Sequence, residues 1–309
     1  MMSFELSVPE PATGGVVTIG NFDGVHRGHQ AMLAEVRELA DARSRPAVVV
    51  TFDPHPVTIL KPALHLPRLS TIPIRTQLLK QHGADYVVVL PVTSELLNMT
   101  PRQFFHEVVV QRLKASAMVE GPDFCFGKDR AGNTDVLRQL CGHVQMELRV
   151  IEPVCAADGM ISSTRIRQLL SDGKVRAAND LLGHAYTICG AVHRGSQRGR
   201  QLGFPTANLC GLEQLLPMDG VYAGRCRMED RNYATAVSIG PNPTFGDDRR
   251  KVECHLVGFV GDLYGSQMTV DILGHVRPLR TFSSVDALTA QIAADVAACT
   301  ALCDEAGQR

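Results

Sequence analysis

Residues 16–30 read VVTIGNFDGVHRGHQ and carry the strongest structural signal in the chain. The β-branched run Val16–Ile19 is typical of a buried strand, and a helical pattern begins near Gln30. A loop with glycines at positions 20, 24 and 28 joins them, so a ligand can approach its backbone closely. In a parallel sheet such a loop presents free amides and a helix N-terminus, which stabilise an anion. The stretch therefore predicts an α/β domain with a phosphate site after its first strand.

Two histidines of this stretch, His26 and His29, lie three positions apart. On the first turn of a helix this spacing places both imidazoles on one side, where they could stabilise charge that develops on a phosphate. A metal pair and simple helix capping are the alternatives. The metal interpretation lacks the glutamate of an H-E-x-x-H motif and a third ligand nearby.

Outward from this stretch, the first half of the chain alternates β-branched runs with helical patterns, which predicts a parallel sheet with right-handed crossovers. The predicted strands are Val16–Ile19, Val48–Phe52, Tyr86–Leu90, Ala117–Glu120 and Leu148–Ile151. The predicted helices are Gln30–Ala42, Ile74–His82, Arg102–Leu113, Asn133–Cys141, Thr164–Ser171 and Val175–Leu182. We expect a Rossmann-like domain over residues 1–183.

After Gly183, strand-like segments follow one another without intervening helices, which predicts an antiparallel β-barrel or sheet. The predicted strands are Tyr186–His193, Gly220–Arg227, Tyr233–Gly240, Lys251–Phe259 and Gln267–Val276. The Ala-rich tail Ser284–Cys303 has an apolar stripe and predicts a C-terminal helix, with Ser283 or Ser284 as its N-cap. We expect this second domain to cover residues 184–309.

The composition limits the classes of partner. A chain of 309 residues exceeds one comfortable core, which supports two domains. A net charge of -1 and 5% aromatic residues without tryptophan argue against a nucleic-acid partner. Nine cysteines without a C-x-x-C pair fit neither a disulfide framework nor a zinc site. With no signal-peptide pattern and only strand-length apolar runs, we expect a cytoplasmic protein with no membrane partner.

Three further segments of the first half stand out beside Gly20–Gln30: Thr51–Pro56 (TFDPHP), Gly121–Lys128 (GPDFCFGK) and Ile161–Arg167 (ISSTRIR). Gly20–Gln30 is similar to the H-x-G-H signature of nucleotidyltransferases. In this order the four segments resemble the motifs of prokaryotic bifunctional riboflavin kinase/FAD synthetases. In the last segment, hydroxyls at 162–164 can cap a helix and donate to phosphate. The planar guanidinium of Arg165 can donate two parallel hydrogen bonds to the phosphate. An ordinary capped surface helix is the alternative.

The resemblance implies that the phosphate of FMN attacks the α-phosphorus of ATP, forming FAD and pyrophosphate without a covalent enzyme intermediate. It implies that His26, His29 and Arg165 are catalytic, through positioning and charge stabilisation. The implied ATP-binding residues are Gly20, Asn21, Phe22, Gly24, His26, His29, Ser162, Ser163, Thr164 and Arg165. The implied flavin-binding residues are Pro54, Pro56, Asp123 and Phe126. The alternative is that the Pro and Gly of these loops serve only to form turns.

In the second half, Arg194–Leu202 (RGSQRGRQL) precedes Gly203–Leu209 (GFPTANL). Alone, the first segment is a solvated basic loop. The second resembles the signature of riboflavin kinases, and the chain has no Walker sequence. Thr206 and Asn208 share a face of an extended segment; the resemblance assigns Mg²⁺ to them, the alternative being polar residues at a strand edge. The implied ATP-binding residues of this domain are Gly195, Arg198, Gly199, Arg200, Thr206 and Asn208.

Four later segments also match the riboflavin kinase pattern: Asp219–Gly224, Ser238–Gly246, Val252–Leu256 and Gly261–Gly265. Glu253 matches the glutamate that this family uses as the base on the ribityl hydroxyl; an outward-facing strand acid is the alternative. Two positions depart from the family. Gly258 stands where an aspartate is common, and Leu279 stands where a glutamate is frequent.

The resemblance runs from about Val16 to Val296 and implies a bifunctional enzyme of flavin cofactor synthesis. It implies an FMN adenylyltransferase domain over 1–183 and a riboflavin kinase domain over 184–309. Riboflavin, FMN and FAD are the implied substrates and products, with ATP as co-substrate and Mg²⁺ as cofactor. A paralogue that keeps one activity or uses a flavin analogue, and a non-catalytic flavin-binding regulator, are the alternatives. The sequence gives no oligomeric state.

Overall fold

The computed structural model describes residues 7–64, 66–157, 159–195, 198–228, 231–242 and 247–307. The side chains of Arg198, Asn242 and residues 247–249 lie outside this description, as do residues 243–246 of the predicted Ser238–Gly246 motif. The chain forms two compact units. We call residues 1–66 and 72–162 the sheet unit, and residues 67–71 and 163–309 the barrel unit.

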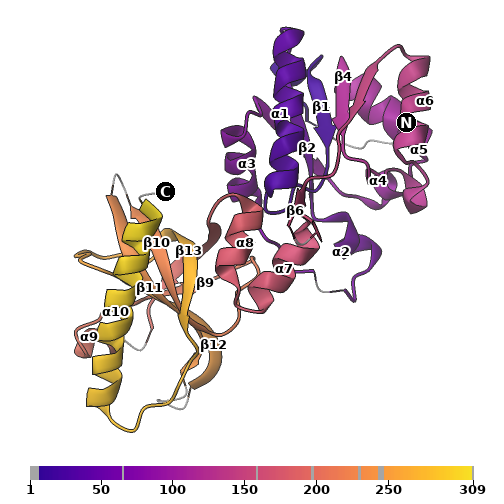
Figure 1. Ribbon diagram of the computed structural model, residues 1–309. Helices are drawn as coiled ribbons and strands as arrows, with labels where there is room; N and C mark the ends of the chain where they lie inside the picture. The colour runs from indigo at the N-terminus through magenta and orange to yellow at the C-terminus, as the bar shows by residue number, and fades with distance from the viewer. Residues whose placement is uncertain are drawn as a thin grey trace. The chain divides into compact units, whose positions relative to one another are not determined.

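The sheet unit is built on a five-stranded sheet in the order β3-β2-β1-β4-β5, of which β2, β1 and β4 are labelled in Figure 1. Its strands are β1 (Val16–Ile19), β2 (Ala47–Asp53), β3 (Tyr86–Pro91), β4 (Ala117–Glu120) and β5 (Glu147–Val150). Every neighbouring pair is parallel, which confirms the predicted parallel sheet.

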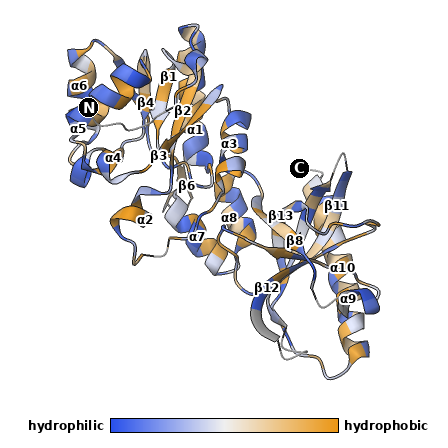
Figure 2. Cartoon of the chain, turned by 180° about the vertical axis from the view of Figure 1, so that it is seen from behind, coloured by the Kyte–Doolittle hydropathy of each residue, from blue (hydrophilic) through white to orange (hydrophobic). Residues whose placement is uncertain are grey.

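Helices bury both faces of this sheet. They are α1 (Arg27–Ala42), α2 (Pro56–Leu60), α3 (Ile72–Gln81), α4 (Ser94–Asn98), α5 (Pro101–Phe104) and α6 (Thr134–His143), with short 3₁₀ turns at Glu10–Ala12 and Lys128–Arg130. Val17 of β1 packs in one core with Phe104 and Leu137, whereas Val16 packs in another with Val36 of α1. Strands buried on both faces carry continuous apolar runs, and β1 and β2 are accordingly coloured as hydrophobic in Figure 2.

The predicted helix Arg102–Leu113 differs in form. After α5 the chain continues as a π-helix over Phe105–Arg112. Phe104, Phe105, Val108 and Val109 are all buried, so the apolar residues recur four positions apart and face the core as the predicted helix required. A two-stranded hairpin, β6 (Cys155–Ala156) and β7 (Gly159–Met160), also forms where no strands were predicted.

The barrel unit contains a closed antiparallel barrel in the order β10-β11-β12-β9-β8-β13. Its strands are β8 (Tyr186–His193), β9 (Ala207–Cys210), β10 (Gly220–Met228), β11 (Arg231–Asn242), β12 (Asp247–Leu256) and β13 (Gln267–Arg277), with a short helix α9 (Arg198–Gln201) between β8 and β9. The barrel prediction is confirmed. Strand β9 was not predicted, because its four residues, of which only Ala207 and Asn208 belong to the G-F-P-T-A-N motif, are too few to show a period.

Two helices before the barrel, α7 (Ser163–Ser171) and α8 (Val175–Leu182), also belong to the barrel unit. The side chain of Asn179 ties α8 to the barrel: Nδ2 donates to the carbonyl of Ile272 at 2.9 Å, and Oδ1 accepts from the amide of Tyr186 at 2.8 Å. Helix α8 ends at Gly183, whose φ of 75° is a left-handed C-cap. These helices lie before residue 184 yet pack with the barrel.

The C-terminal helix α10 (Val285–Gly307) packs on β10, β11 and β13. Ser284 caps it, because its Oγ accepts from the amide of Ala287 at 3.1 Å. With 23 residues and a hydropathy of 1.3, α10 is the one helix in the described part of the chain long and apolar enough to cross a membrane. Its buried Asp295 forms a bidentate ion pair with Arg277 of β13: Nε donates to Oδ1 at 2.9 Å and Nη2 donates to Oδ2 at 2.7 Å.

Candidate functional site

The loop after β1 lies at the point where the strand order of the sheet unit reverses. Strands β2 and β3 lie to one side of β1, and β4 and β5 lie to the other. In open parallel sheets, ligands bind at the carboxyl ends of the strands beside such a switch point. Gly20, Asn21, Phe22 and Gly24 all belong to this loop, as the sequence analysis expected.

The loop is held in a strained form. Phe22 and Val25 adopt φ values of 47° and 40°, which side chains with a Cβ rarely do, and Gly24 has φ 81°. Both strained residues are fully buried and pack with Leu33 and Val49. Their burial therefore holds the loop in this backbone conformation.

His26 and His29 are stacked. Their ring centroids are 3.6 Å apart with planes at 15°, and Phe22 meets His29 edge-on at 5.0 Å. His26 is the N-cap of α1, and its Nδ1 accepts from the amide of His29 at 3.4 Å. Capping, an alternative for this pair, is therefore one role of His26.

The neutral form of His29 is favoured. Burial is the main cause that holds the pKa of His29 well below 6.5, and the charges of His26 and Arg75 lower it further. Its buried Nδ1 has no hydrogen-bond partner among the described residues, and neither has the buried Oδ1 of Asn21. Because buried polar groups are nearly always paired, these atoms indicate that a polar ligand belongs here.

A cavity of about 210 Å³ opens beside this pair. Its lining residues are Ile19, His26, Gly28, His29, Met32, Glu120–Phe124, Ile151–Val154, Met160 and Ile161. The loop residue Asp123 is therefore in the same cavity as the histidines. Glu120, predicted only as the end of a strand, is 1% exposed and lines this cavity. An acid at the carboxyl end of a buried strand was the signal that could have marked it.

A second residue that the sequence analysis missed is Arg75 of α3. Its guanidinium lies 3.2 Å from Asp23 Oδ1, donates to Thr51 Oγ1 at 3.1 Å, and is as buried as Asp23. Asp23 belongs to the loop after β1, so this pair fixes the loop to α3 and β2. No motif marked Arg75, because it is 52 residues from Asp23 in sequence.

The remaining predicted flavin residues lie in two environments. Pro54 and Pro56 flank His55 at the start of α2 and are half-buried. Phe126 is 6% exposed and packs against Phe104 and Phe124, with centroids 5.8 and 5.3 Å away. Phe126 therefore contributes to the core, and its contact with flavin stays a prediction.

The predicted phosphate ligands of the ISSTRIR segment begin helix α7. Ser163, Thr164 and Arg165 occupy its first turn and Ser162 directly precedes it. The predicted helix is thus confirmed, with its hydroxyls at the N-terminus, where helix amides are free. Ser163–Arg165 belong to the barrel unit and His26 to the sheet unit.

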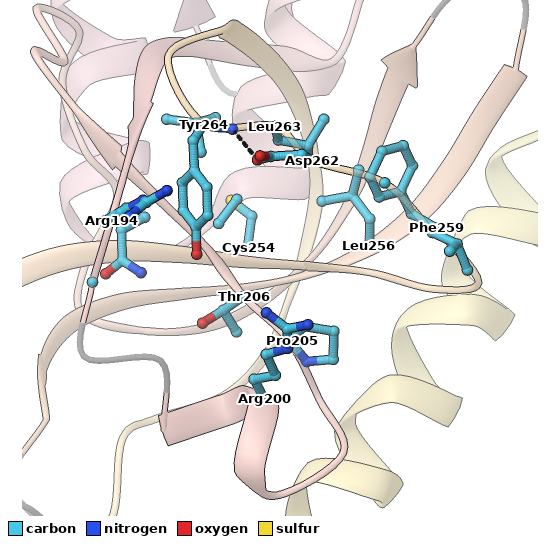
Figure 3. A pocket seen from close by; sticks show the side chains of 16 residues that line it. Arg194, Arg200, Pro205, Thr206, Cys254, Leu256, Phe259, Asp262, Leu263 and Tyr264 are labelled. Atoms are coloured by element: carbon cyan, nitrogen blue, oxygen red, sulfur yellow. Dashed lines mark hydrogen bonds between the residues drawn. The ribbon is translucent and has the colours of Figure 1, made fainter.

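The barrel unit has its own cavity of about 630 Å³, shown in Figure 3. Its lining residues are Val192, Arg194, Gly195, Arg200, Pro205–Asn208, Cys254, Leu256 and Phe259–Tyr264. Four predicted residues of the kinase site, Gly195, Arg200, Thr206 and Asn208, are brought together here. The guanidinium of Arg194 lies over the ring of Tyr264, 5.1 Å from its centroid.

Two glycines of the segment Arg194–Leu202 leave space for residues Phe204–Asn208. A Cβ on Gly195 would stand 2.4 Å from Nδ2 of Asn208, and one on Gly199 would stand 2.4 Å from the carbonyl oxygen of Phe204. On the other side, Nδ1 of His255 on β12 lies 2.8 Å from the carbonyl oxygen of Pro205. The segment that carries Thr206 is therefore clamped between the loop and β12.

Strand pairing places the predicted base next to a predicted metal ligand. Glu253 of β12 is the direct partner of Asn208 on β9 and of Ser238 on β11. Glu253 is half-buried, whereas its neighbours Val252 and Cys254 face the barrel core. Glu253 therefore lies on the face of the strand away from the core, the same face as Asn208, and it is not among the residues that line the cavity of Figure 3.

The oxygens of Thr206 and Asn208 fit a hard cation. No cluster of three or more His, Cys, Asp or Glu that could hold a metal occurs in the described parts of the chain. Mg²⁺ needs few protein ligands, all oxygen, and takes waters and phosphates for the rest. A hydroxyl and an amide oxygen lining one cavity, with Gly195 leaving room for the amide, are consistent with such a site.

The two departures from the family pattern are Gly258 and Leu279. Gly258 is exposed in a turn after β12, with a φ of 74° that suits glycine. Leu279 lies over Gly240, where a Cβ would stand 2.6 Å from Leu279 Cδ1. Neither residue is among those that line the cavity of Figure 3.

Comparisons with known proteins cover nearly the whole chain. A family described as FAD synthetase matches residues 8–165, and one described as riboflavin kinase matches residues 182–303. The chain is 36% identical over 304 residues to a protein of Pseudomonas fluorescens, covering 96% of this chain and 95% of the relative. It is 34% identical over 286 residues to a protein of Escherichia coli K12, covering 92% and 91%. Both relatives are named bifunctional riboflavin kinase/FMN adenylyltransferase.

A solved structure is similar over the same span. It is a crystal structure of a protein of Streptococcus pneumoniae that bears the name macrolide-efflux protein. The TM-score is 0.83 at 33% identity, and the match covers 94% of each chain.

Proposed function

The chain belongs to the family of bifunctional riboflavin kinases/FMN adenylyltransferases, and on this premise we propose how its residues divide the two reactions. The chain phosphorylates riboflavin to FMN and adenylylates FMN to FAD, with ATP as co-substrate in both steps. We assign the adenylyl transfer to residues 1–183 and the phosphorylation to residues 184–309. The family matches over 8–165 and 182–303 support this division.

The stacked pair His26–His29 carries the proposal for adenylyl transfer. The phosphate of FMN is already a nucleophile, so this step needs no protein base; it needs alignment and stabilisation of charge on the α-phosphate. Burial lowers the pKa of His29 and so favours its neutral form, and its buried Nδ1 has no hydrogen-bond partner among the described residues, so its imidazole can hydrogen-bond a phosphate oxygen without a proton transfer. Arg165, Ser162, Ser163 and Thr164 are proposed as phosphate ligands from their motif.

In the kinase reaction, Glu253 is the proposed base that accepts the proton of the ribityl hydroxyl as that oxygen attacks the γ-phosphorus of ATP. Thr206 and Asn208 would hold Mg²⁺, which when bound neutralises charge on the phosphate oxygens. Gly195, Gly199 and Arg200 are proposed to bind the phosphates, the glycines through their backbone. Arg198 shares this assignment through its motif.

We propose a cytoplasmic enzyme that acts on small molecules and has no nucleic-acid or membrane partner. The name of the Streptococcus pneumoniae protein suggests drug efflux. In this chain, however, the helix with membrane-crossing length carries Asp295 in an ion pair with Arg277, against the barrel. The ion pair therefore supports a helix that packs on the barrel rather than one that crosses a membrane.

The test is a time course. Purified protein is incubated with riboflavin, ATP and Mg²⁺, and the flavins are separated at intervals. FMN that appears first and then declines as FAD accumulates is the expected result. Absence of both products would refute the proposal, and FMN without FAD would identify a paralogue with the kinase activity alone.

A further inference from the structure

Glu120 bridges the two strands that border the switch point. Strands β1 and β4 pair at Val16–Ala117 and Val17–Met118, and the strand pairing ends there. Two residues later, the amide of Ile19 donates to Oε1 of Glu120 at 2.9 Å. The carboxyl thus serves as acceptor at the point where the crevice between the strands opens.

The second oxygen of Glu120 is available to a ligand. Within the described chain, no group donates to or accepts from Oε2, although the side chain is 1% exposed and lines the cavity beside the histidines. Burial raises the pKa of Glu120 well above 4.5, and the hydrogen bond from Ile19 only partly opposes this. A neutral carboxyl offers an O–H donor at Oε2 and does not repel a nucleotide.

The cavity has the size and walls for an aromatic base. Its 210 Å³ is below the roughly 300–1,000 Å³ typical of whole-ligand pockets, so it fits one part of a nucleotide. Ile19, Met32 and Ile151 supply apolar walls. Such walls suit a purine ring better than a phosphate, and His26 and His29, which line the same cavity, can contact phosphates that extend from the base.

We propose that Glu120 donates a hydrogen bond from Oε2 to a ring nitrogen of the adenine of ATP, and so helps to hold the base for adenylyl transfer. The inference rests on the proposed function of the sheet unit. Adenine has ring nitrogens that accept and have no hydrogen, so a neutral carboxyl complements them. Ile19 fixes the orientation of the donor through Oε1.

The experiment combines variants of Glu120 with ATP analogues. The rate of FAD formation from FMN is measured with ATP and with its 1-deaza, 3-deaza and 7-deaza forms, each of which replaces one ring nitrogen by carbon. We expect one of these analogues to lower kcat/KM of the unaltered protein by about tenfold, the effect of leaving a buried donor unpaired. With Glu120→Leu, the same analogue and ATP should perform alike, because the donor is gone.

Two further variants separate recognition from folding. Glu120→Gln keeps an acceptor for Ile19 and supplies an N–H donor, so it should recover most of the kcat/KM for ATP that Glu120→Leu loses, mainly through KM. Glu152→Leu removes an exposed carboxyl that lines the same cavity. In this control variant the analogue should still lower kcat/KM, as it does in the unaltered protein. Riboflavin phosphorylation by each preparation reports its folded, active concentration.

The outcomes are distinct. Equal sensitivity of the unaltered protein and Glu120→Leu to all three analogues would overturn the inference, as would insensitivity of the unaltered protein. If 2′-deoxy-ATP, and none of the deaza analogues, lowered kcat/KM of the unaltered protein but not of Glu120→Leu, Glu120 would contact the ribose, and the inference would be contradicted. If the unaltered protein forms no FAD with ATP, the proposed function itself fails.

Discussion

Asn208 on β9 and Glu253 on β12 are direct cross-strand partners in the antiparallel barrel. Side chains of such partners lie on one face, with Cβ atoms about 4.5–5.5 Å apart. The proposed metal ligand and the proposed base are therefore neighbours, although they are 45 positions apart in sequence (253 minus 208). The pairing register alone decides this, since a slip of one residue would turn Glu253 into the barrel core.

Replacing Glu253 by Gln should abolish riboflavin phosphorylation and spare FAD synthesis. The amide keeps the size of the side chain but cannot accept the proton, so the kinase rate should fall by about 10²–10⁴-fold. Both half-reactions are measured on one preparation, the second with added FMN. A kinase rate near that of the unaltered protein would show Glu253 to be only an outward-facing strand residue.

Replacing Gly195 by Ala should impair the kinase through Asn208. The new Cβ would stand 2.4 Å from Asn208 Nδ2, so the amide must move. A displacement of this order should lower kcat/KM for ATP in the kinase reaction by about tenfold or more. Gly142→Ala is the matched control, because no atom lies within 4 Å of its Cβ position. Equal kinase activity of the two variants would separate Gly195 from the site.

Replacing His29 by Ala should lower FAD formation from FMN by about 100-fold or more, the effect of losing one donor to developing charge. Affinity for ATP should change much less, because this interaction strengthens as charge develops. Phosphorylation of riboflavin should continue. Steady-state kinetics of both reactions test this, and unaltered FAD formation would place the anion site elsewhere.

The free energy of unfolding should depend on pH through His29. Its pKa is lowered in the folded protein, mainly by burial and then by His26 and Arg75. A lowered pKa gives a stability contribution that is present above pH 6.5 and lost as the pH falls below it. In His29→Gln this contribution is absent, so urea unfolding should show the free energy of the unaltered protein falling more between pH 7.5 and 5.5. Parallel curves would contradict the assignment.

Replacing Arg75 by Met should leave the carboxylate of Asp23 buried without its guanidinium. Both side chains are at most 4% exposed, and breaking such a pair costs about 3–5 kcal/mol. Urea unfolding of the Arg75→Met variant measures the loss. The double variant Asp23→Asn/Arg75→Met should be more stable than Arg75→Met alone, because the buried charge is removed. The opposite order would show that the pair does not stabilise the loop.

Local features could be read from the sequence because they depend on neighbouring residues. The five parallel strands, the glycine loop after β1 and the cap of α10 at Ser284 follow from β-branched runs, backbone freedom and side-chain capping. The motif of His26 and His29 likewise fixed their position at the start of α1. Short elements such as β9 were missed, since four residues show no period.

Tertiary structure decided what depends on partners far away in the chain. Burial lowers the pKa of His29 and raises that of Glu120, and neither shift is visible in a motif. The contact of Ile19 with Glu120 joins residues 101 positions apart, and that of Arg75 with Asp23 joins residues 52 apart. The sequence alone determined which chemical groups this protein carries and on which local elements. The folded chain determined which of them meet, because proximity and burial are set by strand order and packing across the whole unit.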